Sequence, residues 1–381
     1  MREQLRLAIP ISSLGYGMHA AAHYKALKEL DTIDIKLDII GKSDNADLVI
    51  NQLEIDESIF KADLVRKISR QAPSFILWHS EQIPIYTGKG PNIGATLFET
   101  DKLRNNELAG LAHLNEVCTY SKWGANVLAQ HGIKNAHVIV GPCIPSYTDT
   151  YKAVKPFELL DHYLKDDKII VSAGKWEIRK GHNKFVEDIS ELSKTKQFSV
   201  FAFWNNIFTG GLTQPVNNLL ANGWSLSGQY ILGDIFAYIY SLNNVKLYLF
   251  SHIASHISLL SLYKRADIFA TYSAGEGWDL PCVDSIYMGC DVIGTHNTAH
   301  EEYSSHFKKK LLCDRIIAND GIWFKGERGH WYPPVEEYRL SALESILSNT
   351  NRNNNLENIK SISNFCSLDN ISSKVIKACF P

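Results

Sequence analysis

Two carboxylic acids, Glu276 and Asp284, stand eight residues apart in a stretch that also carries glycines and a proline. Gly275 and Gly277 let the backbone approach a ligand closely, and Pro281 suits the first position of a helix. The stretch therefore reads as a strand, a tight turn and a helix, and the free amides at such a helix start attract anions, above all phosphate. Asp284 lies about one turn into the helix and should lean back toward the same turn as Glu276.

A solvated acid in an ordinary strand-to-helix turn would have the same spacing, so a second group of residues bears on the choice. Lys175, Arg179 and Lys180 follow directly after a predicted strand over residues 168–173. A cation cluster by itself is most often a solvated surface. Here it stands at the carboxyl end of the first strand of a domain whose later strand carries the glycine turn. We therefore interpret it as the counter-charge for phosphate at that turn.

The phrase from Glu276 to Asp284 resembles the donor-binding signature of GT-B glycosyltransferases, above all the retaining family 4. That family carries an acid-glycine-aromatic-x-Leu-Pro turn and a second acid eight residues after the first. The resemblance implies that Glu276 is a catalytic residue beside the donor sugar and that Asp284, usually glutamate in the family, binds the ribose. Lys180 matches the family's phosphate-clamping lysine, and Lys175 stands where an arginine is usual. The resemblance places the donor diphosphate on Lys175, Lys180 and the turn residues Gly277, Trp278, Asp279 and Leu280.

A second glycine loop lies near the N-terminus. Gly15 and Gly17 separate a predicted strand (5–11) from a predicted helix (18–30). With Ala20 they also fit a loose dinucleotide-binding motif, but Asp38, the acid that would bind a ribose, lies inside an apolar run. The family resemblance instead implies that this loop contacts the donor diphosphate or the acceptor.

Further candidates follow the next strands. His79 ends the predicted strand 74–78, where α/β sheets bind ligands. It is either a satisfied structural histidine or a catalytic contact with the transferred sugar or an acceptor hydroxyl. Glu99 and Asp101 belong to a Gly-x-x-x-x-Glu-x-Asp-x-Leu segment that resembles a family 4 subgroup. They could bind acceptor hydroxyls or cap the following helix, and the sequence leaves both open.

Alternating strands and helices predict an α/β chain. The resemblance implies a GT-B architecture: two Rossmann-like doubly wound parallel-sheet domains facing a central cleft. We predict an N-terminal acceptor-binding domain over residues 1–145, a donor domain over 146–355, and a C-terminal helix, 356–381, that crosses back to the first domain. The Gly-Pro-Cys-Ile-Pro segment at 141–145 is the expected hinge. Residues 46–50 are read as a strand, whereas the aromatic and asparagine-rich stretch 204–224 has no clear interpretation.

Composition limits the partners. The 381 residues suffice for two domains, and a net charge of −2 gives no drive toward nucleic acid. The seven cysteines are scattered without Cys-x-x-Cys spacing, which favours reduced thiols in a cytoplasmic protein over disulfides or zinc.

The sequence also bears on membrane contact. No apolar run approaches the roughly 18 residues that span a bilayer, and we expect no signal peptide. Basic runs at 61–70 and 308–310 are compatible with peripheral membrane contact or with solvated faces. The sequence does not indicate the oligomeric state.

From these features we expect a retaining glycosyltransferase that moves a hexose from a GDP- or UDP-linked sugar to a hydroxyl of a glycan or glycolipid, as in polysaccharide biosynthesis. Lysines and turn amides would stabilise the departing diphosphate. Because the sequence has no Asp-x-Asp triplet, we expect no metal ion, and no cofactor. The alternatives are a nucleotide-sugar 2-epimerase on the same fold, a non-catalytic sugar-nucleotide-binding scaffold, and an NAD-dependent oxidoreductase.

Overall fold

The computed structural model describes residues 2–41, 45–157, 164, 168–232, 235–253, 255–326, 328–350 and 356–381. The chain divides into two compact units: Met1–Thr148 with Ser363–Pro381, and Asp149–Ile362. The sequence prediction placed the divisions after residues 145 and 355. The polar segment 351–355 beside the second of these lies outside the described ranges.

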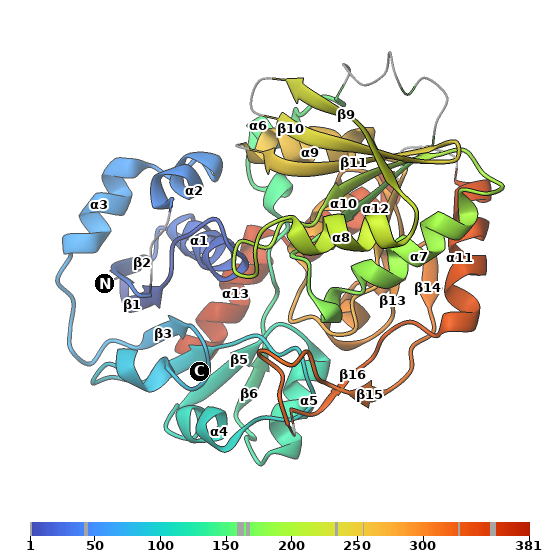
Figure 1. Ribbon diagram of the computed structural model, residues 1–381. Coiled ribbons are helices and arrows are strands. Elements are labelled where there is room, and N and C mark those ends of the chain that lie inside the picture. Colours follow the sequence, from blue (N-terminus) through green and yellow to red (C-terminus); the bar gives the residue numbers. More distant parts are fainter. Residues whose placement is uncertain are drawn as a thin grey trace. The chain divides into compact units, whose positions relative to one another are not determined.

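The first unit is built on a parallel sheet of six strands in the order β2-β1-β3-β4-β5-β6 (Figure 1). Its central strand β3 is buried at all four residues, as expected for a parallel strand covered on both faces, whereas the edge strand β2 alternates apolar and charged residues. The strands are β1 (Glu3–Ile9), β2 (Ile33–Ile39), β3 (Ser74–Leu77), β4 (Asn92–Ala95), β5 (Glu116–Thr119) and β6 (Ala136–Val138). The helices are α1 (Gly15–Lys28), α2 (Ala46–Gln52), α3 (Glu57–Val65), α4 (Asn105–Leu111), α5 (Lys122–Gln130) and α13 (Leu368–Cys379), with short 3-10 turns at Ile83–Tyr86 and Ile144–Ser146.

The C-terminal helix α13 completes the first unit. It packs against α1 and β5 and is drawn in red in Figure 1. Ile371, Val375 and Cys379 share one face of this helix and are buried. The last residues of the chain therefore belong to the same core as the first.

The strand predicted over residues 46–50 is wrong, because this segment begins helix α2. Val49 and Ile50 are buried together with Leu53, at the spacing of one helical face rather than the alternation of a strand. Asp47 lies in the first turn of α2, where a negative charge favours a helix.

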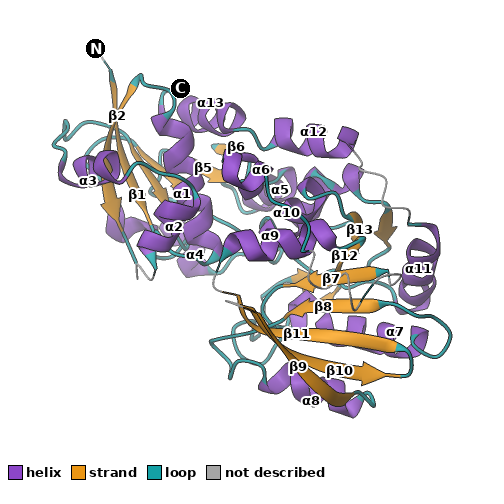
Figure 2. Cartoon of the chain, turned by 90° about the horizontal axis from the view of Figure 1, so that it is seen from above, coloured by secondary structure: helices purple, strands orange, loops and turns teal. Residues whose placement is uncertain are grey.

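The second unit contains an eight-stranded sheet in the order β14-β13-β12-β7-β8-β11-β10-β9. Figure 2 shows β7, β8, β11, β10 and β9 side by side. The strands are β7 (Ile169–Ala173), β8 (Ser199–Phe203), β9 (Ser225–Leu232), β10 (Ile235–Leu242), β11 (Val245–Ile253), β12 (Ile268–Thr271), β13 (Asp291–Thr295) and β14 (Lys309–Leu311), with a separate pair β15 (Ile316–Ile317) and β16 (His330–Trp331). The helices are α6 (Asp149–Lys152), α7 (His182–Leu192), α8 (Thr213–Ala221), α9 (His256–Arg265), α10 (Leu280–Tyr287), α11 (Glu336–Asn349) and α12 (Leu356–Phe365), and the 3-10 turns are η4 (Ile178–Lys180), η5 (Thr298–Glu302) and η6 (Ser304–His306).

This second sheet is mixed, whereas the sequence prediction made it wholly parallel. Strands β9 and β10 are antiparallel and extend the sheet beyond β11. The missed signal is the Asn-Asn pair between Leu242 and Val245, with Asn243 at φ +51°. A two-residue turn with a left-handed asparagine is typical of a β-hairpin.

Strand pairing brings the two predicted phosphate-binding segments to one edge. Strand β12 pairs in parallel with β7, with Ile268 opposite Ile170. The loops that follow the two strands therefore emerge side by side, although they are about a hundred residues apart in sequence. No helix in the described ranges is both long and apolar enough to cross a membrane.

Candidate functional site

The loop after β7 is shaped by glycine. Gly181 has φ +69° and forms the N-cap of α7, and a Cβ on it would lie 2.5 Å from the Tyr272 carbonyl oxygen. Only glycine fits a left-handed position with so close a neighbour. This turn directs the two preceding cations, Arg179 and Lys180, toward the loop that follows β12.

These cations hold Glu276 in a buried ionic cluster. Lys180 Nζ lies 2.6 Å and Arg179 Nη1 lies 3.1 Å from Glu276 Oε1. The Ser273 hydroxyl donates to the same oxygen at 2.5 Å. The side chains of Glu276 and Arg179 are each 5% exposed, and that of Lys180 is 12% exposed. Three groups, the two cations and the serine hydroxyl, thus meet at one carboxylate oxygen that is almost fully buried.

The charges of this cluster fix its ionisation. Burial by itself raises the pKa of Glu276, but Lys180, then Arg179 and His300, outweigh it and lower that pKa to about 2. Burial likewise lowers the pKa of Lys180, yet the opposing Glu276 charge leaves it above its ordinary value. Both groups are therefore charged at neutral pH.

Arg179, which the sequence analysis counted in the cation cluster but gave no separate role, has a structural and an electrostatic role. Its guanidinium donates to the Gly275 carbonyl at 2.5 Å and to Glu177 Oε2 at 3.0 Å. Its own carbonyl accepts from the Ala274 amide at 2.7 Å. Arg179 therefore ties the loop after β7 to the loop after β12, in addition to contacting Glu276.

Lys175 lies differently from Lys180. Its ammonium is 3.0 Å from Glu177 Oε1 and 5.1 Å from the ring centre of Phe208, and its side chain is 43% exposed. It is thus a solvent-facing cation with a carboxylate partner. The predicted diphosphate contact of Lys175 stays a prediction.

The turn of residues 276–280 presents backbone donors. Within the described ranges, no hydrogen-bond acceptor faces the amides of Gly277, Asp279 or Leu280, whereas the Glu276 amide donates to Thr298 Oγ1 at 2.9 Å. Asp279 has φ +74° immediately before α10. Because α10 begins at Leu280, Pro281 is its second residue rather than its first. Three unpaired amides next to a helix start form a suitable site for an anion.

The segment η5 supports this turn. The Ala299 amide donates to the Glu276 carbonyl at 3.2 Å, and the Tyr303 hydroxyl donates to the Trp278 carbonyl. Trp278 is buried and its ring packs edge-on against that of Tyr303, 5.2 Å between centres. The predicted site residue Trp278 is thus an anchor for the turn. Thr298, with φ +49°, and Tyr303 were not predicted as site residues.

The same turn contains residues that could hold a metal ion. Asp279, Cys282 and His300 each offer one ligand atom, and these atoms lie within 4.8 Å of one another. His300 Nε2 is 3.1 Å from Asp279 Oδ2, which also accepts from the Thr271 hydroxyl at 3.2 Å. The sequence prediction of no metal site rested on Cys-x-x-Cys and Asp-x-Asp patterns, which do not cover such a grouping.

Asp284, the predicted ribose ligand, lies inside α10 and is buried. Its Oδ2 is 3.6 Å from His256 Nε2, at the first residue of α9. The pair brings the carboxylate to the start of a second helix. Its ribose contact stays a prediction.

In the first unit, two of the predicted residues, His79 and Glu99, lie near Tyr16, which was not predicted. The Tyr16 ring is 4.8 Å from that of His79, centre to centre. Burial, with the nearby charges of Glu99 and Glu81, raises the pKa of the Tyr16 phenol, and loss of solvent lowers the pKa of His79.

Gly17 is sterically required, because a Cβ there would overlap Ser12, whereas a Cβ on Gly15 would meet no neighbouring atom. Asp101 lies in the loop between β4 and α4 and is partly buried.

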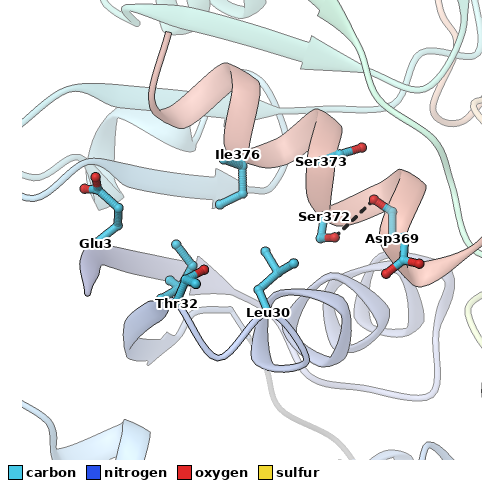
Figure 3. A pocket seen from close by; sticks show the side chains of 8 residues that line it. Glu3, Leu30, Thr32, Asp369, Ser372, Ser373 and Ile376 are labelled. Carbon is cyan, nitrogen blue, oxygen red and sulfur yellow. Dashed lines mark hydrogen bonds between the residues drawn. The ribbon is translucent and has the colours of Figure 1, made fainter. Parts of the chain in front are cut away.

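A cavity of about 340 Å³ lies elsewhere in the first unit (Figure 3). Leu30, Thr32 and Ile33 line it on one side, and Asp369, Ser373 and Ile376 of α13 on the other. None of the predicted site residues lines this cavity.

Comparisons with known proteins show similarity to solved structures, and this similarity concerns the fold. No protein-family model and no curated protein sequence matches it. A glycosyltransferase from Rickettsia africae superposes with a TM-score of 0.58 at 14% identity, over 99% of this chain and 98% of that one. Sucrose-phosphate synthase from Thermosynechococcus elongatus superposes with a TM-score of 0.63 at 12% identity, over 100% of this chain and 99% of that one. Anabaena HepE in complex with UDP superposes with a TM-score of 0.62 at 12% identity, over 98% of both chains. The chain therefore has the GT-B fold of these glycosyltransferases.

Proposed function

We propose that the chain is a glycosyltransferase that binds a nucleoside-diphosphate sugar on its second unit and, like family 4, retains the configuration of the transferred hexose. The buried cluster of Lys180, Arg179 and Glu276, beside three unpaired turn amides, carries this proposal. Cations and amide donors gathered at one point suit a diphosphate. Anabaena HepE, which shares the fold, forms complexes with UDP and with UDP-glucose, and this favours a donor of the same class.

Donor binding would exchange one partner of Lys180 for another. In the structure the Lys180 ammonium contacts Glu276, which also has Arg179 as a partner at 3.1 Å. A diphosphate on the turn amides would draw Lys180 toward itself. Glu276 would then keep Arg179 as its counter-charge and offer its freed lone pairs to hydroxyls of the donor sugar.

The chemistry follows from where charge develops. Cleavage of the bond between the anomeric carbon and the phosphate oxygen places negative charge on the diphosphate and positive charge on the sugar ring. The negative charge on the diphosphate would be stabilised by Lys180 and by the amides of Gly277, Asp279 and Leu280. The positive charge on the sugar ring would be stabilised by Glu276. With retention, the acceptor attacks on the face that the diphosphate leaves, and its proton passes to a phosphate oxygen. No side chain of the protein need then act as base.

Three further roles complete the proposal. Asp284 would bind the ribose, and Lys175 would add a second cation near the diphosphate. In the first unit, His79, Glu99 and Asp101 would bind hydroxyls of a glycan or glycolipid acceptor.

Calorimetric titration with UDP, GDP and ADP tests the donor site. We expect UDP or GDP to bind, and Lys180→Met to weaken that binding about ten- to a hundredfold, the range for loss of a charge-assisted hydrogen bond. Lys184→Met is the matched control, because Lys184 is 42% exposed and pairs with Glu187 on α7. Wild-type affinity in the Lys180 variant, or no binding of any of the three nucleotides, would contradict the proposal.

The fate of a bound donor separates the alternatives. Proton NMR of the anomeric signal of UDP-glucose or GDP-mannose, without acceptor, should show slow hydrolysis to free sugar and nucleotide. Conversion of the donor into a second nucleotide sugar would instead identify an epimerase.

A further inference from the structure

Three ligand-type side chains meet behind the donor turn: Asp279, Cys282 and His300. They come from the turn itself, from the first turn of α10 and from η5. Asp279 is 7% exposed, and Cys282 and His300 are fully buried. Such a group could be a hydrogen-bonded core cluster or a metal site. The two possibilities differ in how the lone pairs of His300 and Asp279 are satisfied.

Both ring nitrogens of His300 face acceptors. Nδ1 lies 3.0 Å from the Thr295 carbonyl oxygen, which can only accept. The Thr295 hydroxyl, 3.2 Å from Nδ1, donates its proton to the Ser273 carbonyl and so cannot donate to the ring. Nδ1 therefore carries the hydrogen, and in a neutral imidazole the Nε2 lone pair points at the Asp279 carboxylate. A cation, either a second proton or a metal ion, must lie between them.

The second carboxylate oxygen favours the metal ion. Among the described residues, Asp279 Oδ1 is buried without a hydrogen-bond partner. A proton between His300 and Oδ2 would leave that oxygen unsatisfied, which is costly in a buried site. A metal ion bound through Oδ1 would satisfy that oxygen and could also accept lone pairs from the imidazole and the Cys282 sulfur.

The surrounding hydrogen bonds match those that orient metal ligands. A ligating histidine usually donates its other ring N–H to a carbonyl or carboxylate, as His300 Nδ1 does to Thr295. A ligating carboxylate is itself hydrogen-bonded, as Asp279 Oδ2 is by the Thr271 hydroxyl. The outer contacts of a metal centre are thus present around all the oxygen and nitrogen ligands of the group.

We propose that Asp279, Cys282 and His300 bind a zinc ion, which fastens the donor turn to η5. One sulfur, one imidazole nitrogen and one carboxylate oxygen are ligands that Zn²⁺ accepts, and a thiolate with a carboxylate balances its charge. No fourth histidine, cysteine or acid of the described residues joins the group, so water completes the tetrahedron. This site does not depend on the proposed transferase activity, and it replaces the expectation from sequence of no metal.

Cobalt substitution tests the site without any nucleotide. The full-length protein, stripped with a chelator and titrated with Co²⁺, should develop a thiolate-to-cobalt charge-transfer band and the visible bands of tetrahedral cobalt. Cys282→Ala should abolish the charge-transfer band, and His300→Ala should weaken cobalt binding at least tenfold. Cys290→Ala is the matched control and should leave the spectrum unchanged, because buried Cys290 instead donates its thiol hydrogen to the Tyr263 carbonyl at 3.2 Å.

Zinc should also raise the melting temperature of the stripped wild-type protein and of Cys290→Ala, but not that of Cys282→Ala. This measurement on wild-type protein stands even if a variant folds poorly. Absence of a thiolate-cobalt band in the wild type, or its persistence in Cys282→Ala, would overturn the site and leave a proton between His300 and Asp279. Failure of UDP and GDP to bind would count against the proposed transferase alone.

Discussion

Lys180 Nζ and Glu276 Oε1 lie 2.6 Å apart, although 96 positions separate them in the chain, and both side chains are almost fully buried. A buried pair of this kind contributes little net stability, because desolvation offsets the attraction, yet removal of one partner costs about 3–5 kcal/mol. Under the proposed function, its place at the edge where β7 and β12 end prepares this edge for a charged ligand.

Glu276→Gln should separate donor binding from transfer. The amide keeps the shape of the side chain but no longer competes with diphosphate for Lys180, so affinity for the cognate nucleotide should stay the same or rise. Turnover of the donor should fall about a hundredfold or more, as when one stabilising group of a transition state is removed. Calorimetry and donor hydrolysis on the same preparation measure both, and weaker nucleotide binding would count against the proposed exchange of partners.

Acid should weaken the fold through Glu276. Its pKa is about 2 in the folded protein against an ordinary value of 4.5. A folded-state pKa below the unfolded one stabilises the protein above about pH 4.5, and the contribution, about 3 kcal/mol, is lost as the pH falls toward 2. In urea titrations the difference in unfolding free energy between wild type and Glu276→Gln should narrow between pH 5 and pH 2. A constant difference would show that Glu276 is not held by charge.

The two glycines of the N-terminal loop should respond differently to alanine. A Cβ at Gly17 would overlap the backbone and hydroxyl of Ser12, whereas a Cβ at Gly15 meets nothing within 4 Å. We expect Gly17→Ala to destabilise by about 1–3 kcal/mol, as overpacking does, and Gly15→Ala to be nearly neutral. Thermal unfolding of both variants checks this, and equal melting temperatures would contradict it.

Arg339 should be a key residue for the stability of the second unit. Its guanidinium donates to Asp188 Oδ1 at 2.9 Å and to Glu187 Oε2 at 2.6 Å, and the Tyr272 hydroxyl donates to Asp188 Oδ2 at 2.9 Å. Arg339→Leu leaves Asp188 buried without its counter-charge and should cost about 3–5 kcal/mol in urea unfolding.

An exposed pair provides the control for Arg339. Lys194 and Glu191 are 2.6 Å apart, with side chains 62% and 54% exposed. Lys194→Met should change the unfolding free energy by less than about 1 kcal/mol. Similar losses in the two variants would show that burial does not govern these ion pairs.

The sequence predicted the segments of the site better than the orientation of its side chains. The glycine spacing and the strand ends predicted that the regions of Lys180 and Glu276 lie together, because parallel strands align their carboxyl ends. They did not show that Arg179 turns inward while Lys175 faces solvent, since that depends on the left-handed Gly181 and its contact with Tyr272. The grouping of Asp279 with His300 was equally hidden, because it depends on how η5 folds back over the turn.

Fold prediction failed where local signals competed. Residues 46–50 are apolar enough for a strand, but burial on one helical face decided the outcome. The β9–β10 extension has its clearest local signal in the turn at Asn243, and an otherwise parallel domain gave no reason to expect antiparallel strands.

The closing helix α13 has a consequence for synthesis on the ribosome. The second unit, Asp149–Ile362, is continuous in the chain, whereas the first needs residues from both termini. Ile371 and Val375 cannot reach their places in the first unit until the whole second unit has been translated. The nascent chain should therefore assemble its second unit while the first still waits for its final helix, the reverse of the usual N-to-C order of domain folding.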